Sequence, residues 1–195
     1  MNTRDFYNKN AFDYYNKTIE ATNLENLMYF ESQIKKNGLI MDLGCGSGRD
    51  SLYFKSKGFN VLPVDYSEGL ANISFEKNGL KILNKDFREM NFEINCYDGI
   101  WANASLLHLT KNEFIEIIPK LYNSLKDRGF LYFSLKPTNE DCKEEIKNGR
   151  FFTYYNSNEI KKILKKINIE VYDFWETDSV IENGQRWLNF LIWKK

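Results

Sequence analysis

Residues 41–50 of the chain, MDLGCGSGRD, decide its fold. The apolar run at 39–41 is typical of a short buried strand that ends at Asp42, and 49–57 has the pattern of the helix that follows. A glycine has no Cβ, so it can adopt a positive φ and let the backbone approach a ligand closely. The turn holds three glycines at alternate positions: Gly44, Gly46 and Gly48. The stretch therefore predicts a cofactor site on the first strand-to-helix turn of an α/β sheet.

The spacing of these glycines excludes two common phosphate-binding turns. A dinucleotide-binding dehydrogenase turn has the spacing G-x-G-x-x-G, but here the third glycine position holds Arg49 or Ser51, depending on which glycine begins the pattern. A Walker turn needs Gly-Lys followed by Ser or Thr, and that triplet does not follow. One alternative stays open: the turn could only pack a helix against a strand.

Beyond this turn, strand-like and helix-like apolar patterns alternate along the chain. Such alternation is typical of βαβ units wound into a mainly parallel sheet. Aromatic and aliphatic residues at helical spacing predict two helices between residues 3 and 34. The remaining predictions are strands at 60–64, 81–83, 97–102 and 129–135, helices at 70–75, 111–125 and 157–166, a long polar loop or flap at 136–149, and a terminal strand pair at 169–175 and 187–193.

Length and composition favour one folded domain. The chain has 195 residues, of which 43% are hydrophobic and 16% aromatic, and this is enough apolar material to cover both faces of a sheet. We expect a single domain, 1–195, with a helical cap at 1–36, a cofactor-binding core at 37–135, and a flap with the last strands at 136–195.

Net charge and cysteine spacing limit the kinds of partner and the cellular location that the sequence predicts. Lys plus Arg equals Asp plus Glu at 27 each, so no basic excess favours a nucleic acid, and we do not expect one as a partner. The three cysteines, at 45, 96 and 142, have no paired spacing, which argues against disulfides and against a metal site. No leader pattern and no run of about 18 apolar residues occurs. We therefore expect a cytoplasmic protein without a membrane span, as a monomer or homodimer.

Four motifs give the chain a resemblance to a known family. Residues 41–50 resemble motif I of the class I S-adenosylmethionine-dependent methyltransferases, and 64–67 (VDYS), 85–87 (KDF) and 97–102 (YDGIWA) resemble its second-strand acidic site, its adenine site and its fourth strand. With 105–109 (SLLHL), the chain is most similar to small bacterial methyltransferases of the tellurite-resistance type. The resemblance implies an α/β, Rossmann-like class I methyltransferase fold, with a mostly parallel seven-stranded sheet, helices on both faces and an antiparallel C-terminal strand. It also implies S-adenosylmethionine as cofactor, with S-adenosylhomocysteine as its product.

The resemblance further assigns roles to particular residues. It implies that Asp65 binds the ribose hydroxyls and that Asp86 accepts a hydrogen bond from the adenine amine. Asp42 would lie near the methionyl amino group, although an aspartate here could instead only cap a helix or brace the loop. The expected cofactor-binding residues are Tyr15, Asp42, Gly44, Cys45, Gly46, Gly48, Arg49, Asp65, Tyr66, Ser67, Asp86, Phe87, Ala102, Asn103 and Ala104.

His108 is the candidate catalytic residue. Methyl transfer from a sulfonium depends on proximity and orientation more than on a catalytic dyad. An acceptor oxygen or nitrogen that must lose a proton still benefits from a base, and the only histidine of the chain follows the fourth strand on the acceptor side. The alternative is a histidine that only braces the loop.

The acceptor is expected to contact the N-terminal helices, the flap at 136–152 and the segment 182–187, which this fold places over the carboxyl ends of the strands. An aromatic, partly cationic lid could be formed by Tyr7, Tyr14, Tyr15, Arg150, Tyr154, Arg186 and Trp187, or the aromatics could be core and the arginines surface ion pairs. Of these, Tyr15 and Arg150 are selected, with Arg150 as the candidate substrate residue, because Gly149-Arg150-Phe151-Phe152 resembles a segment of these relatives. The sequence thus predicts methyl transfer to a small molecule: a metabolite, a xenobiotic or a metalloid oxyanion. The alternatives are a tRNA-modifying methyltransferase, a nucleotide-dependent oxidoreductase and a binding module that only senses the cofactor.

Overall fold

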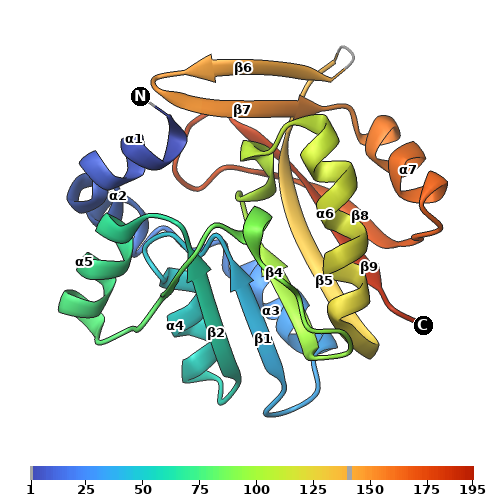
Figure 1. The fold of residues 1–195 in the computed structure, drawn as a ribbon, viewed down its shortest axis with the longest axis horizontal. Helices are drawn as coiled ribbons and strands as arrows, with labels where there is room; N and C mark the ends of the chain where they lie inside the picture. The colour runs from blue at the N-terminus through green and yellow to red at the C-terminus, as the bar shows by residue number, and fades with distance from the viewer. Residues whose placement is uncertain (1, 140–141) are drawn as a thin grey trace.

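A parallel sheet forms the centre of the computed structural model, which describes residues 2–139 and 142–195. Its first five strands are β1 (Leu39–Leu43), β2 (Asn60–Asp65), β3 (Leu83–Asn84), β4 (Tyr97–Ala102) and β5 (Leu125–Pro137). They lie in the order β3-β2-β1-β4-β5, and all neighbouring pairs are parallel (Figure 1). The strand order changes direction between β1 and β4, and ligands of open α/β sheets bind at such a point, beyond the carboxyl ends of the strands.

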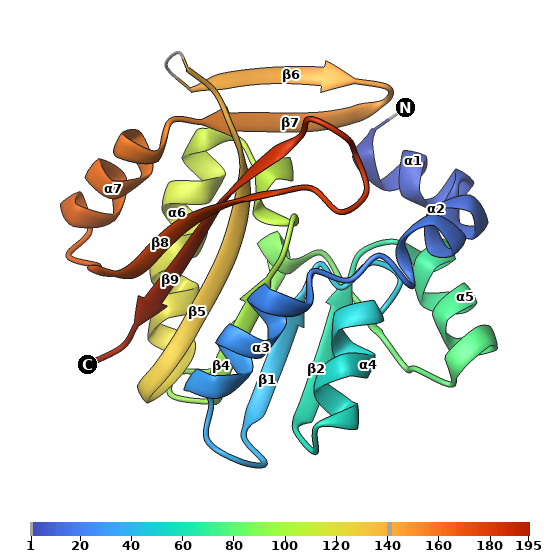
Figure 2. The same cartoon turned by 180° about the vertical axis from the view of Figure 1, so that it is seen from behind.

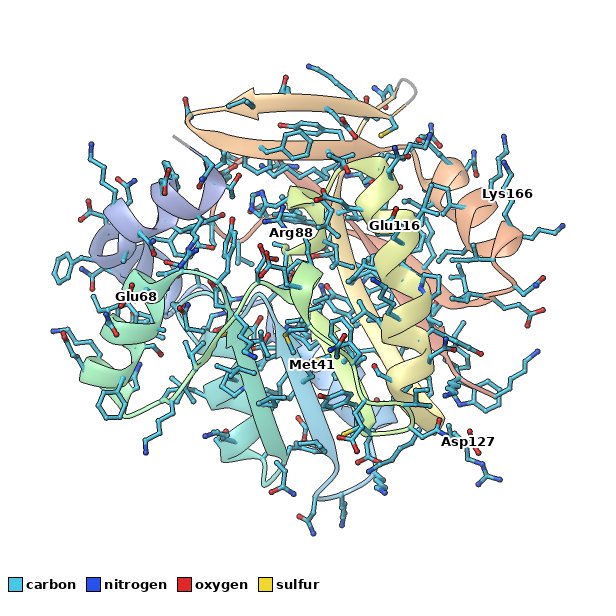
Figure 3. All side chains as sticks on the ribbon, in the orientation of Figure 1. Met41, Glu68, Arg88, Glu116, Asp127 and Lys166 are labelled. Carbon is cyan, nitrogen blue, oxygen red and sulfur yellow. The ribbon has the colours of Figure 1, made fainter. Side chains whose placement is uncertain are left out.

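Helices cover both faces of this sheet, as the alternating pattern predicts. On one face, α3 (Leu24–Gln33) and α4 (Arg49–Ser56) pack Phe30 and Phe54 against Trp101; Figure 2 shows both helices in front of the strands. On the other face, α6 (Lys111–Ser124) closes a larger core that contains Met41. Figure 3 shows Met41 in the middle of the sheet.

The N-terminal segment contains one helix more than the sequence predicts. α1 (Thr3–Lys9) and α2 (Ala11–Thr18) precede α3, because Asn10 ends the first helix and begins the second with a non-helical backbone conformation. Its side-chain amide donates to the carbonyl of Phe6 at 2.7 Å, which stabilises this break. Both helices pack on α5 (Glu68–Asn78) through a small separate core that includes Tyr7, Tyr15 and Leu70.

The predicted flap is largely a β-hairpin, and the prediction of a loop at 136–149 is wrong there. β6 (Lys143–Lys147) pairs antiparallel with β7 (Arg150–Tyr155) across a turn at Asn148 and Gly149, whose φ values are 52° and 78°. Positive φ at both positions is the geometry that favours an Asn-Gly hairpin. The charged residues of β6 hid the strand, although the Asn-Gly pair marked the turn. Residues 140 and 141 of the predicted flap lie outside the described residues.

The C-terminal elements agree with prediction in type and place. α7 (Ser157–Lys166) is followed by β8 (Val171–Asp178) and β9 (Arg186–Trp193), and β9 runs antiparallel to β5 with Phe190 opposite Phe133. The sheet therefore has nine strands in the described part of the chain, and the prediction of seven is wrong. β6 and β7 account for the difference, because β7 extends the sheet beside the end of β5, with Lys136 opposite Tyr154. None of the helices of this part combines the length and apolar character that a bilayer span requires.

Candidate functional site

A cavity of about 710 Å³ lies beyond the carboxyl ends of β1, β2 and β4. Its cofactor end, as predicted from the motifs, is formed by the glycine turn and by the residues that follow β2, β3 and β4. The opposite end is formed by α1, by the β6–β7 hairpin and by the loop between β8 and β9. The predicted residues that line it are Asp42, Gly44, Cys45, Gly46, Arg49, Asp65, Tyr66, Asp86, Phe87, Asn103, Ala104 and His108.

The three glycines of the turn all adopt a positive φ, at 74°, 56° and 80°. A Cβ on Gly44 would lie 2.4 Å from the Cβ of Ser105, and one on Gly48 would lie 2.3 Å from the side chain of Leu80. A Cβ on Gly46 would meet only the ring of Tyr14, at 3.4 Å. The sequence argument that glycine makes room for a ligand therefore applies at Gly46, whereas the other two are required by backbone conformation and by neighbouring protein atoms.

Two aspartates and one arginine lie where the end of β1 meets the start of α4. The Asp42 carboxylate accepts a hydrogen bond from the Ser51 hydroxyl at 2.5 Å. Asp50 binds the Arg49 guanidinium at 2.6 and 2.9 Å, and also accepts hydrogen bonds from the indole of Trp101 and the amide of Asn103. Arg49 in turn donates to the carbonyl of Ala21. The position of Arg49 at the cavity wall is thus fixed by contacts within the protein.

Three buried acidic groups line this end of the cavity. Asp42, Asp50 and Asp65 are all buried, with exposed fractions of 2%, 6% and 6%. Burial, together with the charge of Asp50, raises the pKa of Asp42, and burial raises that of Asp65. Burial also opposes the charged form of Asp50, but the guanidinium of Arg49 holds its pKa below the usual range.

These charges fit a cationic ligand. Asp50 pairs with Arg49, whereas burial raises the pKa of Asp42, so a positive group beside Asp42 would favour the ionised form of its carboxyl. The sulfonium and ammonium of S-adenosylmethionine are such groups. The hydroxyl of Ser105, which also borders the cavity, is buried without a hydrogen-bond partner among the described residues, and this is a further sign of room for a polar ligand.

Asp65 lies at the end of β2, where a ribose is expected. Its carboxylate accepts hydrogen bonds from the backbone N–H groups of Gly46, at 2.9 Å, and Ser67, at 2.8 Å. The carboxylate thereby links the glycine turn to the start of α5. The hydroxyl of Ser67 caps α5 and donates to Asn8 at 2.8 Å, which places this side chain behind the cavity wall.

Asp86 and Phe87 lie on the side of the cavity expected for adenine. Asp86 begins a 3₁₀ turn, η1 (Phe87–Glu89), and binds the guanidinium of Arg88 in two hydrogen bonds to Nε and one to Nη2. Although burial opposes its charged form, the hydrogen bonds from Arg88 hold the pKa of Asp86 below the usual range. Figure 3 shows Arg88 above the strand ends, and this residue also lines the cavity.

His108 ends a second 3₁₀ turn, η2 (Leu106–His108), and is held on both ring nitrogens. Its Nδ1 lies 2.6 Å from the carbonyl oxygen of Phe151, and its Nε2 lies 3.0 Å from the hydroxyl of Tyr7. A carbonyl can only accept, so Nδ1 carries the proton and Nε2 accepts from Tyr7. Burial lowers the pKa of His108 to about 4, and the charges of Arg150 and Lys136 add to this effect. The ring is therefore neutral near pH 7.

Five of the predicted residues lie outside the cavity lining. Ala102 is fully buried within β4, Gly48 lies in the turn against Leu80 and Ser74, and Ser67 caps α5. The hydroxyl of Tyr15 accepts a hydrogen bond from Asn78 in the small core on α5. The guanidinium of Arg150 lies between the rings of Phe6, at 4.7 Å, and Phe152, at 5.0 Å.

Several residues that line the cavity were not selected as site residues from the sequence, although Tyr7 and Tyr14 were considered as members of a lid. Tyr7 and Tyr14 come from α1 and α2, and Asn26 and Asn189 form a hydrogen-bonded pair between α3 and β9. Their helical or strand periodicity was indistinguishable from that of core residues. Only the fold brings segments so distant in the sequence to one cavity. No group of three or more His, Cys, Asp or Glu side chains suited to a metal ion occurs among the residues described.

Comparisons with known proteins agree with this geometry. Residues 40–129 match the family model of a methyltransferase domain. The chain is 26% identical over 191 residues to the "Probable S-adenosyl-L-methionine-dependent methyltransferase TehB" of Haemophilus influenzae, with 94% of this chain and 65% of that protein covered. It is 29% identical over 113 residues to YqeM of Bacillus subtilis, with 55% of this chain and 46% of that protein covered. The chain thus spans about half to two thirds of these relatives.

A solved structure supports the fold over nearly the whole chain. The 1,6-didemethyltoxoflavin-N1-methyltransferase of Burkholderia thailandensis, with S-adenosylhomocysteine bound, superimposes with a TM-score of 0.81 at 16% identity, covering 98% of this chain and 87% of that one.

Fold, motifs and relatives point to one class: residues 40–129 match a methyltransferase domain, and the chain has the Rossmann-like fold of the S-adenosylmethionine-dependent methyltransferases. Within that class, the similarity to the Haemophilus protein extends over 94% of the chain and confirms the narrower resemblance indicated by the motifs.

Proposed function

We propose that the protein transfers the methyl group of S-adenosylmethionine to a small-molecule acceptor. The observation that carries this proposal is one cavity that joins the acidic glycine turn to the Tyr7–His108 pair. Its volume of about 710 Å³ lies within the range usual for small-molecule sites. The Burkholderia enzyme, whose bound compound is a small molecule, gives further support.

In this proposal the carboxylates of the turn hold the cofactor. Asp65 binds the ribose hydroxyls with the lone pairs that the backbone leaves free, and Phe87 borders the adenine. Asp42 faces the methionyl group, where a positive charge favours its ionised form.

The helical cap at 1–36, the core at 37–135 and the segment 136–195 act as one domain in this proposal. The free cysteines suit a cytoplasmic location.

His108 and Tyr7 form the acceptor-side pair. Bound S-adenosylmethionine supplies an activated methyl group on a cationic sulfur. Tyr7 and His108 both line the cavity, and the Tyr7 hydroxyl offers a path by which a proton released by the acceptor reaches Nε2. With its pKa lowered to about 4, His108 is a weak proton acceptor near pH 7. The pair therefore suits an acceptor that reacts as an anion, or that carries no proton on the reacting atom.

The test is S-adenosylhomocysteine formation with a panel of thiols, amines, phenols and metalloid oxyanions. For an acceptor that must lose its proton, His108→Gln and Tyr7→Phe should each lower kcat by about 10²- to 10⁴-fold, with cofactor affinity nearly intact. For an acceptor that is already an anion, both variants should turn over almost as the parent does. If both variants kept the kcat of the parent with every acceptor, His108 would only hold Phe151 in place. If the parent formed no product with any acceptor, the proposed function would be contradicted.

The lowered pKa of His108 also predicts how stability varies with pH. Because its folded pKa lies below the usual value of about 6.5, the neutral ring contributes stability above pH 6.5 that is lost as pH falls towards 4. Urea unfolding of the parent and of His108→Gln should therefore converge between those values. A constant difference across this range would show that His108 titrates normally.

A further inference from the structure

Three exposed apolar side chains meet at the outer end of the cavity. Ile146 is 74% exposed, Val180 is 55% exposed and Ile181 is 37% exposed, and all three line the cavity that contains His108. Single exposed apolar residues are common on protein surfaces. These three come from two separate segments, the β6–β7 hairpin and the loop after β8, and converge on one opening. Figures 1 and 2 both show that loop beneath β7 and beside α1.

An apolar path connects this rim to the interior. Ile146 stands opposite Phe151 in the β6–β7 ladder, so their side chains share one face of the hairpin, and both line the cavity. Trp187, at the start of β9, lines the cavity on the side of Val180 and Ile181. Aliphatic and aromatic side chains from two hairpins thus border this part of the cavity, beside the polar residues Thr177, Asp178 and Ser179.

The inner end of the same cavity is polar. Tyr7 and His108 are hydrogen-bonded there, and the amide side chains of Asn26 and Asn189 lie 3.2 Å apart in the wall. A ligand that extends from the pair to the rim therefore meets polar groups at one end and apolar groups at the other. An ion or a very small polar molecule would leave the apolar rim in water.

We propose that the acceptor is amphipathic, with its reacting polar group at Tyr7 and His108 and an apolar body that lies along Phe151 and Trp187 to the rim of Ile146, Val180 and Ile181. This inference rests on the proposed function, because it takes the Tyr7–His108 end as the place of the acceptor. It adds the chemical class of that acceptor: a molecule with an aliphatic or aromatic portion several carbons long. A metalloid oxyanion does not use this part of the cavity.

The test uses 4-alkylphenols, from methyl to hexyl, as binding probes in calorimetry with S-adenosylhomocysteine present. Affinity should rise about two- to fourfold with each added methylene, as apolar burial predicts. In the double variant Ile146→Ser/Val180→Ser the increase should flatten, because the rim loses two of its apolar side chains. Both side chains are exposed and neither supports the core, so the variant should fold as the parent does. Ile94→Ser, at a residue that is 72% exposed but outside the cavity lining, is the matched control and should keep the slope of the parent.

Failure of this inference is distinct from failure of the proposed function. S-adenosylhomocysteine binding tests the function, and the chain-length slope tests the acceptor class; the slope is measured on the protein alone if the nucleoside does not bind. A flat slope in the parent, or the same slope in parent and double variant, would overturn the inference. The inference would also be overturned if the slope were flat and the parent, but not the double variant, sedimented with phosphatidylcholine–phosphatidylglycerol vesicles. That result would assign the rim to a lipid surface.

Discussion

Asp65 shows how one side chain serves both the fold and the proposed cofactor. Its two carboxylate oxygens accept hydrogen bonds from Gly46 and Ser67, and the same group borders the cavity at the end of β2. The sequence predicted the second role from a motif but not the first. Hydrogen bonds donated by backbone N–H groups of a distant turn leave no pattern in the residue types, so only the folded chain reveals them.

Replacing Asp65 should therefore weaken cofactor binding. Asp65→Ala should weaken S-adenosylhomocysteine binding by about 1.5–3 kcal/mol, or about 10- to 150-fold, the range for losing hydrogen bonds to a charged group. Ser67→Ala is the matched control: it removes the cap of α5, costing about 1 kcal/mol of stability, but leaves the carboxylate in place. Calorimetry and thermal unfolding separate the two effects, and unchanged affinity in Asp65→Ala would remove the ribose role.

Among the elements, the central strands followed from the sequence and the outer hairpin did not. β1, β4 and β5 contain the apolar runs 39–41, 100–102 and 130–133, since both faces of these segments are covered by helices or by other strands. β6 carries charged residues and Ile146, and it lies at the edge of the sheet beside β7 alone. Its pairing depends on β7, so its own composition suggested a loop.

Asp98 in β4 joins the beginnings of three strands. It accepts a hydrogen bond from the Leu39 N–H of β1 at 2.8 Å and forms ion pairs with Lys126 of β5 and with Lys35, each at 2.9 Å. Burial opposes its charged form, but the Leu39 N–H and the two lysines hold the pKa of Asp98 below its usual value.

Asp98→Ala should lower the free energy of unfolding by about 1.5–3 kcal/mol at pH 7, the range for hydrogen bonds to a charged group. Because the folded pKa is lowered, this stability is present above the unfolded value of about 3.9 and is lost as pH falls through the folded pKa. Urea unfolding should show the difference between parent and variant shrinking below pH 3.9. Lys35→Ala, at a side chain that is 67% exposed, should cost less than about 1 kcal/mol. An equal loss in both variants would contradict the role of the Leu39 bond.

At the scale of the whole molecule, the cavity has two ends of different origin. The end proposed for the cofactor is built from turns that directly follow β1, β2 and β4, so motifs of a few residues were enough to select residues that line it. The acceptor end joins α1, the β6–β7 hairpin and the loop after β8, which lie far apart in the sequence. Sequence reasoning placed these segments over the strands but could not predict which side chains meet, and so Tyr15 and Arg150 were selected while Tyr7 was not.

The most direct test of this account is calorimetric titration of the full chain with S-adenosylmethionine and with S-adenosylhomocysteine. We expect both to bind with dissociation constants in the micromolar range, about −8 kcal/mol, and each to raise the unfolding temperature roughly with the logarithm of its concentration above that constant. No binding of either compound at about millimolar concentration would contradict the account, because the acidic glycine turn would then serve only the fold or a different ligand.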